Sequence, residues 1–156
     1  YDLVNMKTKL FCVLIYLMCN IHLFATDRCQ ANVIKLHCSS GTSFLRGSTV
    51  GVDLDVTYII DFANLIMIQV GKTGKIHYAI SDYTCKEKCD GGIVYEFEAT
   101  REQHKFSVEL HWNQYDVVYI VKHYATPHCC VKDEYDMGTY CEFADQVQVD
   151  GYNLIL

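Results

Sequence analysis

The chain has 156 residues, of which 13 are lysine or arginine and 19 are aspartate or glutamate, so its formal net charge is −6. Binding of phosphate groups requires clustered basic side chains. No basic run occurs in this acidic chain. We therefore expect neither nucleic acid nor an anionic membrane surface as a partner.

The N-terminal residues are typical of a secretory signal peptide. Residues 1–5 precede the first methionine, Met6, and are interpreted as upstream translated sequence. After Met6 come two lysines, the apolar stretch FCVLIYLMCNIHLF, and Ala25 as a small residue suited to cleavage. We predict a signal peptide at 6–25 and a single domain at 26–156, located in the extracellular space or the endolysosomal lumen.

The apolar stretch of this signal is a poor candidate for a membrane span, because it is short and is interrupted by Asn20 and His22. A retained anchor is the alternative. No other segment has the length to cross a bilayer, so we expect a protein that does not span the membrane. The mature chain of roughly 130 residues is long enough for one domain with a real core.

The expected state of the cysteines that follow the predicted signal depends on the cellular compartment. In an oxidising environment seven cysteines indicate three disulfides and one free thiol. They are Cys29, Cys38, Cys85, Cys89, Cys129, Cys130 and Cys141. A redox pair would normally be C-x-x-C beside a βαβ unit, and a zinc site would need a second set of ligands, for which the spacing of the histidines is not diagnostic. We favour a structural disulfide for the close pair Cys85 and Cys89 over a metal site.

Alternation of apolar and polar residues predicts strands along most of the mature chain. The segments are STVGVDLDVTYII at 48–60, NLIMIQV at 64–70, KIHYAI at 75–80, IVYEFEA at 93–99, KFSVELHW at 105–112, YDVVYIVKHY at 115–124 and EFADQVQV at 142–149. In the last of these, Phe143, Val147 and Val149 are expected to share a face. Helical periodicity is not sustained anywhere, so seven or eight short strands predict an antiparallel sandwich or barrel.

Four sequence features, in this order, resemble the ML (lipid-recognition) domain family, which includes the mite group-2 allergens and the Niemann-Pick sterol carrier. They are RCQANVIKLHC, LRGSTVGVDLDV, CKEKCDGGIVYEF and KFSVELHW. The resemblance runs from Cys29 to about Tyr124. It implies an immunoglobulin-like antiparallel β-sandwich of seven to eight strands, stapled by disulfides.

The resemblance also implies disulfide partners. Cys85 and Cys89 would form a short-loop disulfide, and Cys29 would be bridged to one of the C-terminal cysteines, Cys129, Cys130 or Cys141. Cys38 has no partner within the next few residues, unlike the family pattern, and is expected to pair with another C-terminal cysteine. The disulfide set is therefore predicted to comprise Cys29, Cys38, Cys85, Cys89, Cys130 and Cys141.

In function, the resemblance implies a cavity between two sheets that holds an apolar ligand such as a fatty acid or a sterol. The side chains expected to line it are Val56, Tyr58, Ile80, Tyr95, Phe97, Phe106 and Val108. The residues themselves allow this cavity without requiring it, and a closed hydrophobic core is the alternative. The lysines of the short loop, Lys86 and Lys88, would either lie in a solvated turn or meet the head group of an anionic lipid.

No catalytic, metal-binding or cofactor-binding motif is found, so we expect a binding protein and not an enzyme. Two functions remain open. The first is a soluble carrier or sensor of an apolar molecule. The second is a secreted interaction protein that binds a protein partner, such as an immune receptor, without an internal ligand. We expect a monomer.

Overall fold

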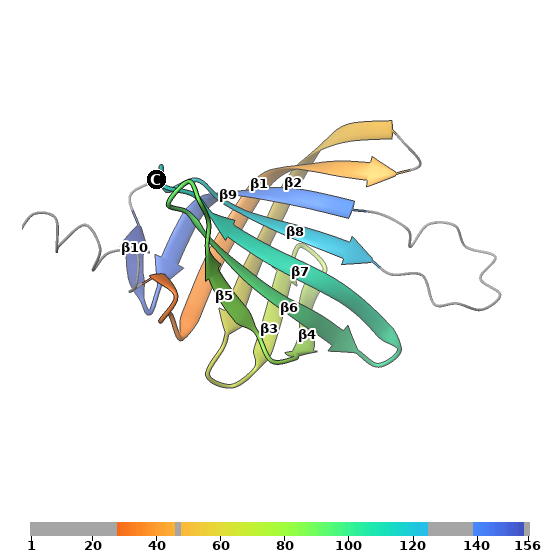
Figure 1. The fold of residues 1–156 in the computed structure, drawn as a ribbon. Helices are drawn as coiled ribbons and strands as arrows, with labels where there is room; N and C mark the ends of the chain where they lie inside the picture. Colours follow the sequence, from red (N-terminus) through yellow and green to blue (C-terminus); the bar gives the residue numbers. More distant parts are fainter. Residues whose placement is uncertain (1–27, 46–47, 125–138, 155–156) are drawn as a thin grey trace, which may run out of the picture.

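The structure is a computed structural model that describes residues 28–45, 48–124 and 139–154. The predicted signal peptide and the cysteines Cys129 and Cys130 lie outside the described residues. The described part of the chain forms ten strands (Figure 1). They are β1 (Val33–Leu45), β2 (Ser48–Asp61), β3 (Ile66–Gly71), β4 (Gly74–Ile80), β5 (Thr84–Glu87), β6 (Ile93–Arg101), β7 (His104–Trp112), β8 (Val118–Tyr124), β9 (Thr139–Val149) and β10 (Tyr152–Leu154).

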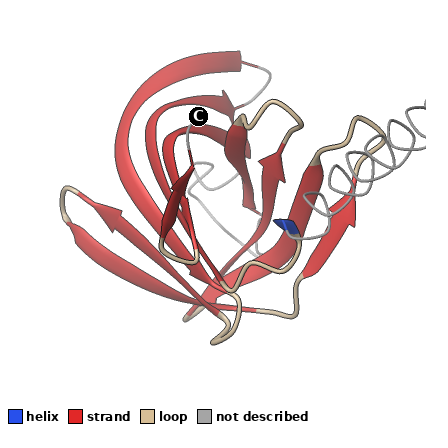
Figure 2. Cartoon of the chain, turned by 90° about the vertical axis from the view of Figure 1, so that its left-hand side faces the viewer, coloured by secondary structure: helices blue, strands red, loops and turns tan. Residues whose placement is uncertain are grey.

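The strands form one antiparallel sheet that closes on itself. Its order is β1-β2-β3-β4-β6-β7-β8-β9-β10, and β9 also pairs with β1, from Ile34 opposite Val149 to Phe44 opposite Thr139. Eight strands therefore make a closed ring, to which β5 and β10 are attached through β6 and β9. The strands curve around a common interior (Figure 2). The all-β, antiparallel, disulfide-containing fold is confirmed, but a single closed sheet replaces the expected immunoglobulin-like sandwich of two sheets.

Closure depends on β1, a strand of 13 residues that alternation alone did not predict. β1 pairs with β2 on one edge and with β9 on the other, so it joins the first and last parts of the ring. Such pairing leaves no free edge on either side of β1, which is how a closed sheet avoids the exposed edges of a sandwich.

An irregularity in β9 changes which of its residues face inward. His37 of β1 lies opposite Gln146, but the next residue, Cys38, lies opposite Ala144, so Asp145 is an extra residue in β9. A bulge of one residue reverses the alternation of the strand beyond it. Val147 is therefore buried, whereas Phe143 is exposed, and the prediction that these two residues share a face is wrong.

The inward faces of the strands form one hydrophobic core. Its largest fully buried side chains include Tyr58, Tyr95, Phe106, Ile34 and Leu36. Their alternation with outward polar residues explains why the strand segments could be recognised in the sequence. In the part of the chain that the structure describes, no helix is long and apolar enough to cross a membrane.

Candidate functional site

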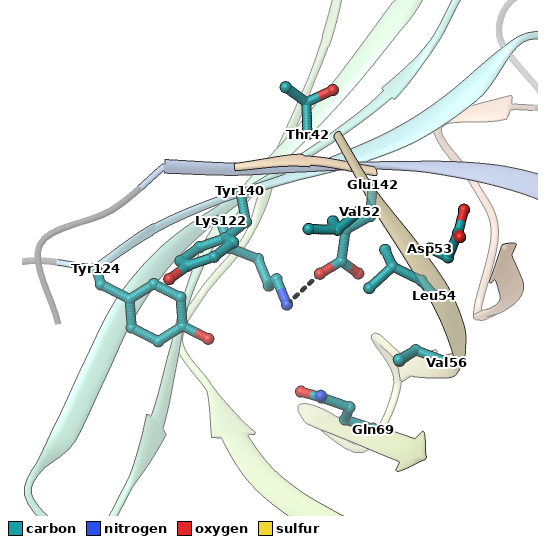
Figure 3. Close-up of a pocket in the computed structure, with 10 residues that line it drawn as sticks. All are labelled: Thr42, Val52, Asp53, Leu54, Val56, Gln69, Lys122, Tyr124, Tyr140 and Glu142. Atoms are coloured by element: carbon teal, nitrogen blue, oxygen red, sulfur yellow. Dashed lines mark ion pairs between the residues drawn. The ribbon is translucent and has the colours of Figure 1, made fainter. Parts of the chain in front are cut away.

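The interior of the barrel is not filled completely. A cavity of about 560 Å³ lies between β2 and β3 on one side and β8 and β9 on the other (Figure 3). Its apolar and aromatic walls are formed by Val52, Leu54, Val56, Tyr124 and Tyr140. Polar residues complete the lining, with the side chains of Gln69, Lys122 and Glu142 and with parts of Thr42 and Asp53. An eight-stranded barrel is wide enough for its side chains to fill the interior or to leave room for one small ligand, and here it leaves room.

A cluster of polar groups lies within this cavity. The Lys122 Nζ is 2.7 Å from Glu142 Oε1, and both side chains are almost fully buried, with 6% and 7% exposure. The hydroxyl of Tyr58, a fully buried residue, donates to Glu142 Oε2 at 2.5 Å and accepts from Lys122 Nζ at 2.6 Å. Each of these side chains thus contacts both others, and Figure 3 shows the Lys122 ammonium directed toward the middle of the cavity.

The electrostatics of this cluster keep it neutral overall. Burial and the neighbouring Glu142 carboxylate raise the pKa of the Tyr58 hydroxyl well above its ordinary value, so this hydroxyl stays protonated and remains a donor. The charges of the Lys122 ammonium and the Glu142 carboxylate cancel each other.

Asp53 is exposed, and its carboxylate points away from the cavity because Val52 and Leu54, on either side of it, point inward (Figure 3).

The free thiol of Cys38 lies in the core close to this cluster. It is fully buried, and burial, followed by the Glu142 carboxylate, raises its pKa to about 12. A thiol with such a pKa is not a nucleophile at neutral pH. Cys38 therefore acts as a small apolar side chain, and the expectation that it forms a disulfide is wrong.

The opposite end of the barrel is covered by the segment that precedes β1. The Arg28 guanidinium lies over the Trp112 ring, 4.8 Å from its centroid, and pairs with Asp116 at 2.9 Å. The indole N–H of Trp112 also donates to Asp116, at 2.9 Å, and the Tyr95 hydroxyl donates to the backbone oxygen of Arg28. These contacts close the end of the barrel that lies away from the cavity.

The disulfide at this end differs from the predicted pairing. Cys29 is bonded to Cys85, so the covering segment is attached covalently to β5. Cys89 is an exposed free thiol, and Cys141 is free and half-buried. The predicted short-loop disulfide between Cys85 and Cys89 is therefore wrong, as is a bridge from Cys29 to the C-terminal cysteines.

The predicted ligand-lining residues are only partly at the cavity. Val56 lines it, and Tyr58 supplies the hydroxyl of the polar cluster. The other five are buried in the core outside the cavity lining, and they are Ile80, Tyr95, Phe97, Phe106 and Val108. They face the interior of the barrel, as expected for inward positions, but the structure uses them for packing.

The two lysines proposed for a lipid head group are not near the cavity. Lys86 is exposed and pairs with Glu96 at 2.6 Å, while Lys88 Nζ is 2.6 Å from Nδ1 of His111. Lys88 lies beside Trp112, which pairs with Val118 at the start of β8, whereas the cavity residue Tyr124 lies at its end. Six residues of extended strand separate those ends by roughly 20 Å. Lys86 and Lys88 therefore do not lie at this cavity, and their contact with an anionic head group stays a prediction.

Sequence reasoning missed every residue that lines the cavity except Val56, and the missed residues include both members of the ion pair. Lys122 lies in a predicted strand, on the same face as the buried Val118 and Ile120, so a charge in register with apolar residues was a readable signal. Glu142 gave no such signal, because the bulge at Asp145 sets its orientation.

Together, the fold and the site define an antiparallel up-and-down β-barrel with a partly polar cavity that is partly open to solvent. Comparison with known proteins adds no closer assignment: no family model, no curated protein and no solved structure matches the chain.

Proposed function

We propose that this chain binds a small, largely apolar molecule, such as a fatty acid, a sterol or a similar compound, inside its barrel. The observation that carries the proposal is the cavity between β2, β3, β8 and β9, which is partly open to solvent. Its volume of about 560 Å³ lies within the range of roughly 300–1,000 Å³ that is usual for ligand pockets, and its walls combine apolar and aromatic side chains with a few convergent polar groups.

The arrangement of the polar groups supports binding over catalysis. Lys122, Glu142 and Tyr58 are hydrogen-bonded to one another. A catalytic base or nucleophile would need a perturbed pKa close to the working pH and a reacting atom within reach. The Tyr58 hydroxyl has its pKa moved away from neutrality instead. We propose a binding protein, and we propose secretion on the ground that the Cys29–Cys85 disulfide suits an oxidising compartment.

The test places one bulky side chain inside the barrel and another outside it. Leu54 points into the cavity, and its neighbour Asp55 is exposed on the outer face of the same strand. Leu54→Trp should fill the cavity and weaken binding of a fluorescent apolar probe at least about tenfold, while Asp55→Trp should leave binding unchanged. Equal binding by both folded variants would place the ligand elsewhere.

Organic extraction and native mass spectrometry of the purified protein provide an independent measurement. A bound apolar molecule released on extraction supports the proposal. A protein that carries no ligand and binds no apolar probe favours the second function, an interaction protein whose outer surface binds a protein partner.

A further inference from the structure

We propose that the Lys122–Glu142–Tyr58 cluster makes the cavity select neutral apolar molecules that carry a hydroxyl group, and reject the matching carboxylate and the matching ammonium. This inference rests on the proposed function, because it assumes that an apolar molecule enters the barrel. It adds the chemical class of the head group.

The charged groups at the cavity disfavour a charged ligand. Among the described residues that line the cavity, Lys122 and Glu142 are the charged groups directed into it, and they are already paired at 2.7 Å. A ligand carboxylate that approached Lys122 would also approach Glu142, and a ligand ammonium that approached Glu142 would also approach Lys122. An incoming charge would lose its water and find no unpaired counter-charge, which is the costly case for a buried ion.

The hydrogen-bonding capacity of Lys122 and Glu142 favours a ligand hydroxyl. An ammonium has three N–H donors, and Lys122 uses two of them on Glu142 and Tyr58. Within the part of the chain that the structure describes, one N–H is left for a ligand acceptor. Each carboxylate oxygen of Glu142 accepts one hydrogen bond in the cluster and has a second lone pair for a ligand donor. A ligand hydroxyl both accepts and donates, so it can use the spare N–H and the spare lone pair together.

The Tyr58 hydroxyl holds this arrangement in place. Its single proton is given to Glu142 and its oxygen accepts from Lys122, so the cluster is cross-linked at a position two residues deeper along β2 than Val56, which lines the cavity wall. The ligand hydroxyl would therefore meet a preorganised donor and acceptor, while the rest of the molecule contacts Leu54, Val56 and the aromatic walls.

The experiment compares three ligands with the same alkyl chain: 1-decanol, decanoate and decylammonium, each competing with a fluorescent apolar probe at pH 7. We expect decanol to bind at least about tenfold more tightly than either charged ligand. If the fluorescent apolar probe itself does not bind, the proposed function fails; if the probe binds but decanol does not displace it, the cavity is a ligand site and the inference about the hydroxyl head group is overturned. If decanoate or decylammonium binds as well as decanol, the cavity is a ligand site but the inference about the head group is overturned.

Charge variants of the cluster give a second, directional readout. Glu142→Gln leaves Lys122 without its counter-charge and should move the preference toward decanoate by about tenfold or more, while Lys122→Gln should move it toward decylammonium. The matched control is Glu98→Gln. It breaks the exposed ion pair between Glu98 and Lys105, whose charged atoms are also 2.7 Å apart, and should leave the relative affinities for the three ligands unchanged. If the folded cluster variants keep the natural protein's relative affinities for the three ligands, the inference is overturned. If those variants do not fold, the three-ligand comparison on the natural protein still tests it.

Discussion

Removing one member of the buried ion pair between Lys122 and Glu142 should lower the free energy of unfolding far more than removing both members together. In Lys122→Met, the Glu142 carboxylate keeps its 7% exposure but loses its counter-ion at 2.7 Å. An uncompensated buried charge costs about 3–5 kcal/mol, a large part of the roughly 5–15 kcal/mol by which a domain of this size is usually stable. We therefore expect the urea midpoint to fall sharply in this variant.

Removing both charges isolates the contribution of the third group. In the double variant Lys122→Met/Glu142→Leu no charge is left unpaired, but the Tyr58 hydroxyl has lost both of its partners. A buried hydroxyl without a partner costs about 1–3 kcal/mol. Adding Tyr58→Phe should recover that loss, because an apolar replacement of a whole buried polar cluster is often neutral or stabilising.

The assay is equilibrium urea unfolding of the single, double and triple variants, with an exposed pair as the reference. Lys105 and Glu98 are separated by the same 2.7 Å but are 57% and 50% exposed, so Lys105→Met should cost less than about 1 kcal/mol. If Lys122→Met costs no more than Lys105→Met, water screens the pair inside the cavity, and the reasoning from burial is refuted.

The remaining predictions concern the disulfide, the surface histidine His37 and the close contact at Gly41. The Cys29–Cys85 disulfide closes a loop of 56 residues, so replacing both cysteines by serine should lower the free energy of unfolding by about 4 kcal/mol, measured by urea unfolding; a loss below about 1 kcal/mol would contradict the chain-entropy argument. His37 has a raised pKa, chiefly because it hydrogen-bonds the Asp145 carboxylate. Its stabilising contribution is therefore full below the unfolded-state pKa of about 6.5 and is lost as pH rises through the higher folded-state value. The melting temperature should show this decline as pH rises above the unfolded-state pKa of about 6.5, and His37→Gln should abolish it. A Cβ at Gly41 would lie 2.9 Å from a backbone carbonyl oxygen of β9, so Gly41→Ala should cost about 1–3 kcal/mol by urea unfolding, and a neutral result would show that β9 can shift.

Alternation predicted most of the strands because the interior of a barrel and that of a sandwich impose the same pattern on a sequence. β2, β4, β6 and β7 lie within two residues of their expected bounds. The pattern reports which side of a strand is buried, but not which strand pairs with which. The choice between one closed sheet and two stacked sheets depends on the pairing of β1 with β9, a contact between strands that lie far apart in the chain.

The disulfide could not be derived from sequence for a related reason. Cys85 has a near neighbour in Cys89, and spacing alone favours that partner. The structure instead brings Cys29 to Cys85, with 5.6 Å between their Cα atoms, because the segment before β1 folds across the end of the barrel. The position of that segment depends on the contacts of Arg28 with Trp112, Asn113 and Asp116, which lie some 85 residues further along the chain.

The proposed binding of a ligand would explain the polar cluster better than stability does. Burying Lys122 and Glu142 costs both side chains their hydration, and well-packed apolar residues in their place would leave the barrel as stable or more so. The triple variant Lys122→Met/Glu142→Leu/Tyr58→Phe should therefore match or exceed the natural protein in urea unfolding. In the decanol, decanoate and decylammonium series it should also lose its preference for the alcohol, because no directed donor or acceptor from the cluster remains. Retained preference in a stable triple variant would assign head-group recognition to other side chains. Loss of both stability and preference would show that the cluster is needed for folding, and the two measurements together separate these outcomes.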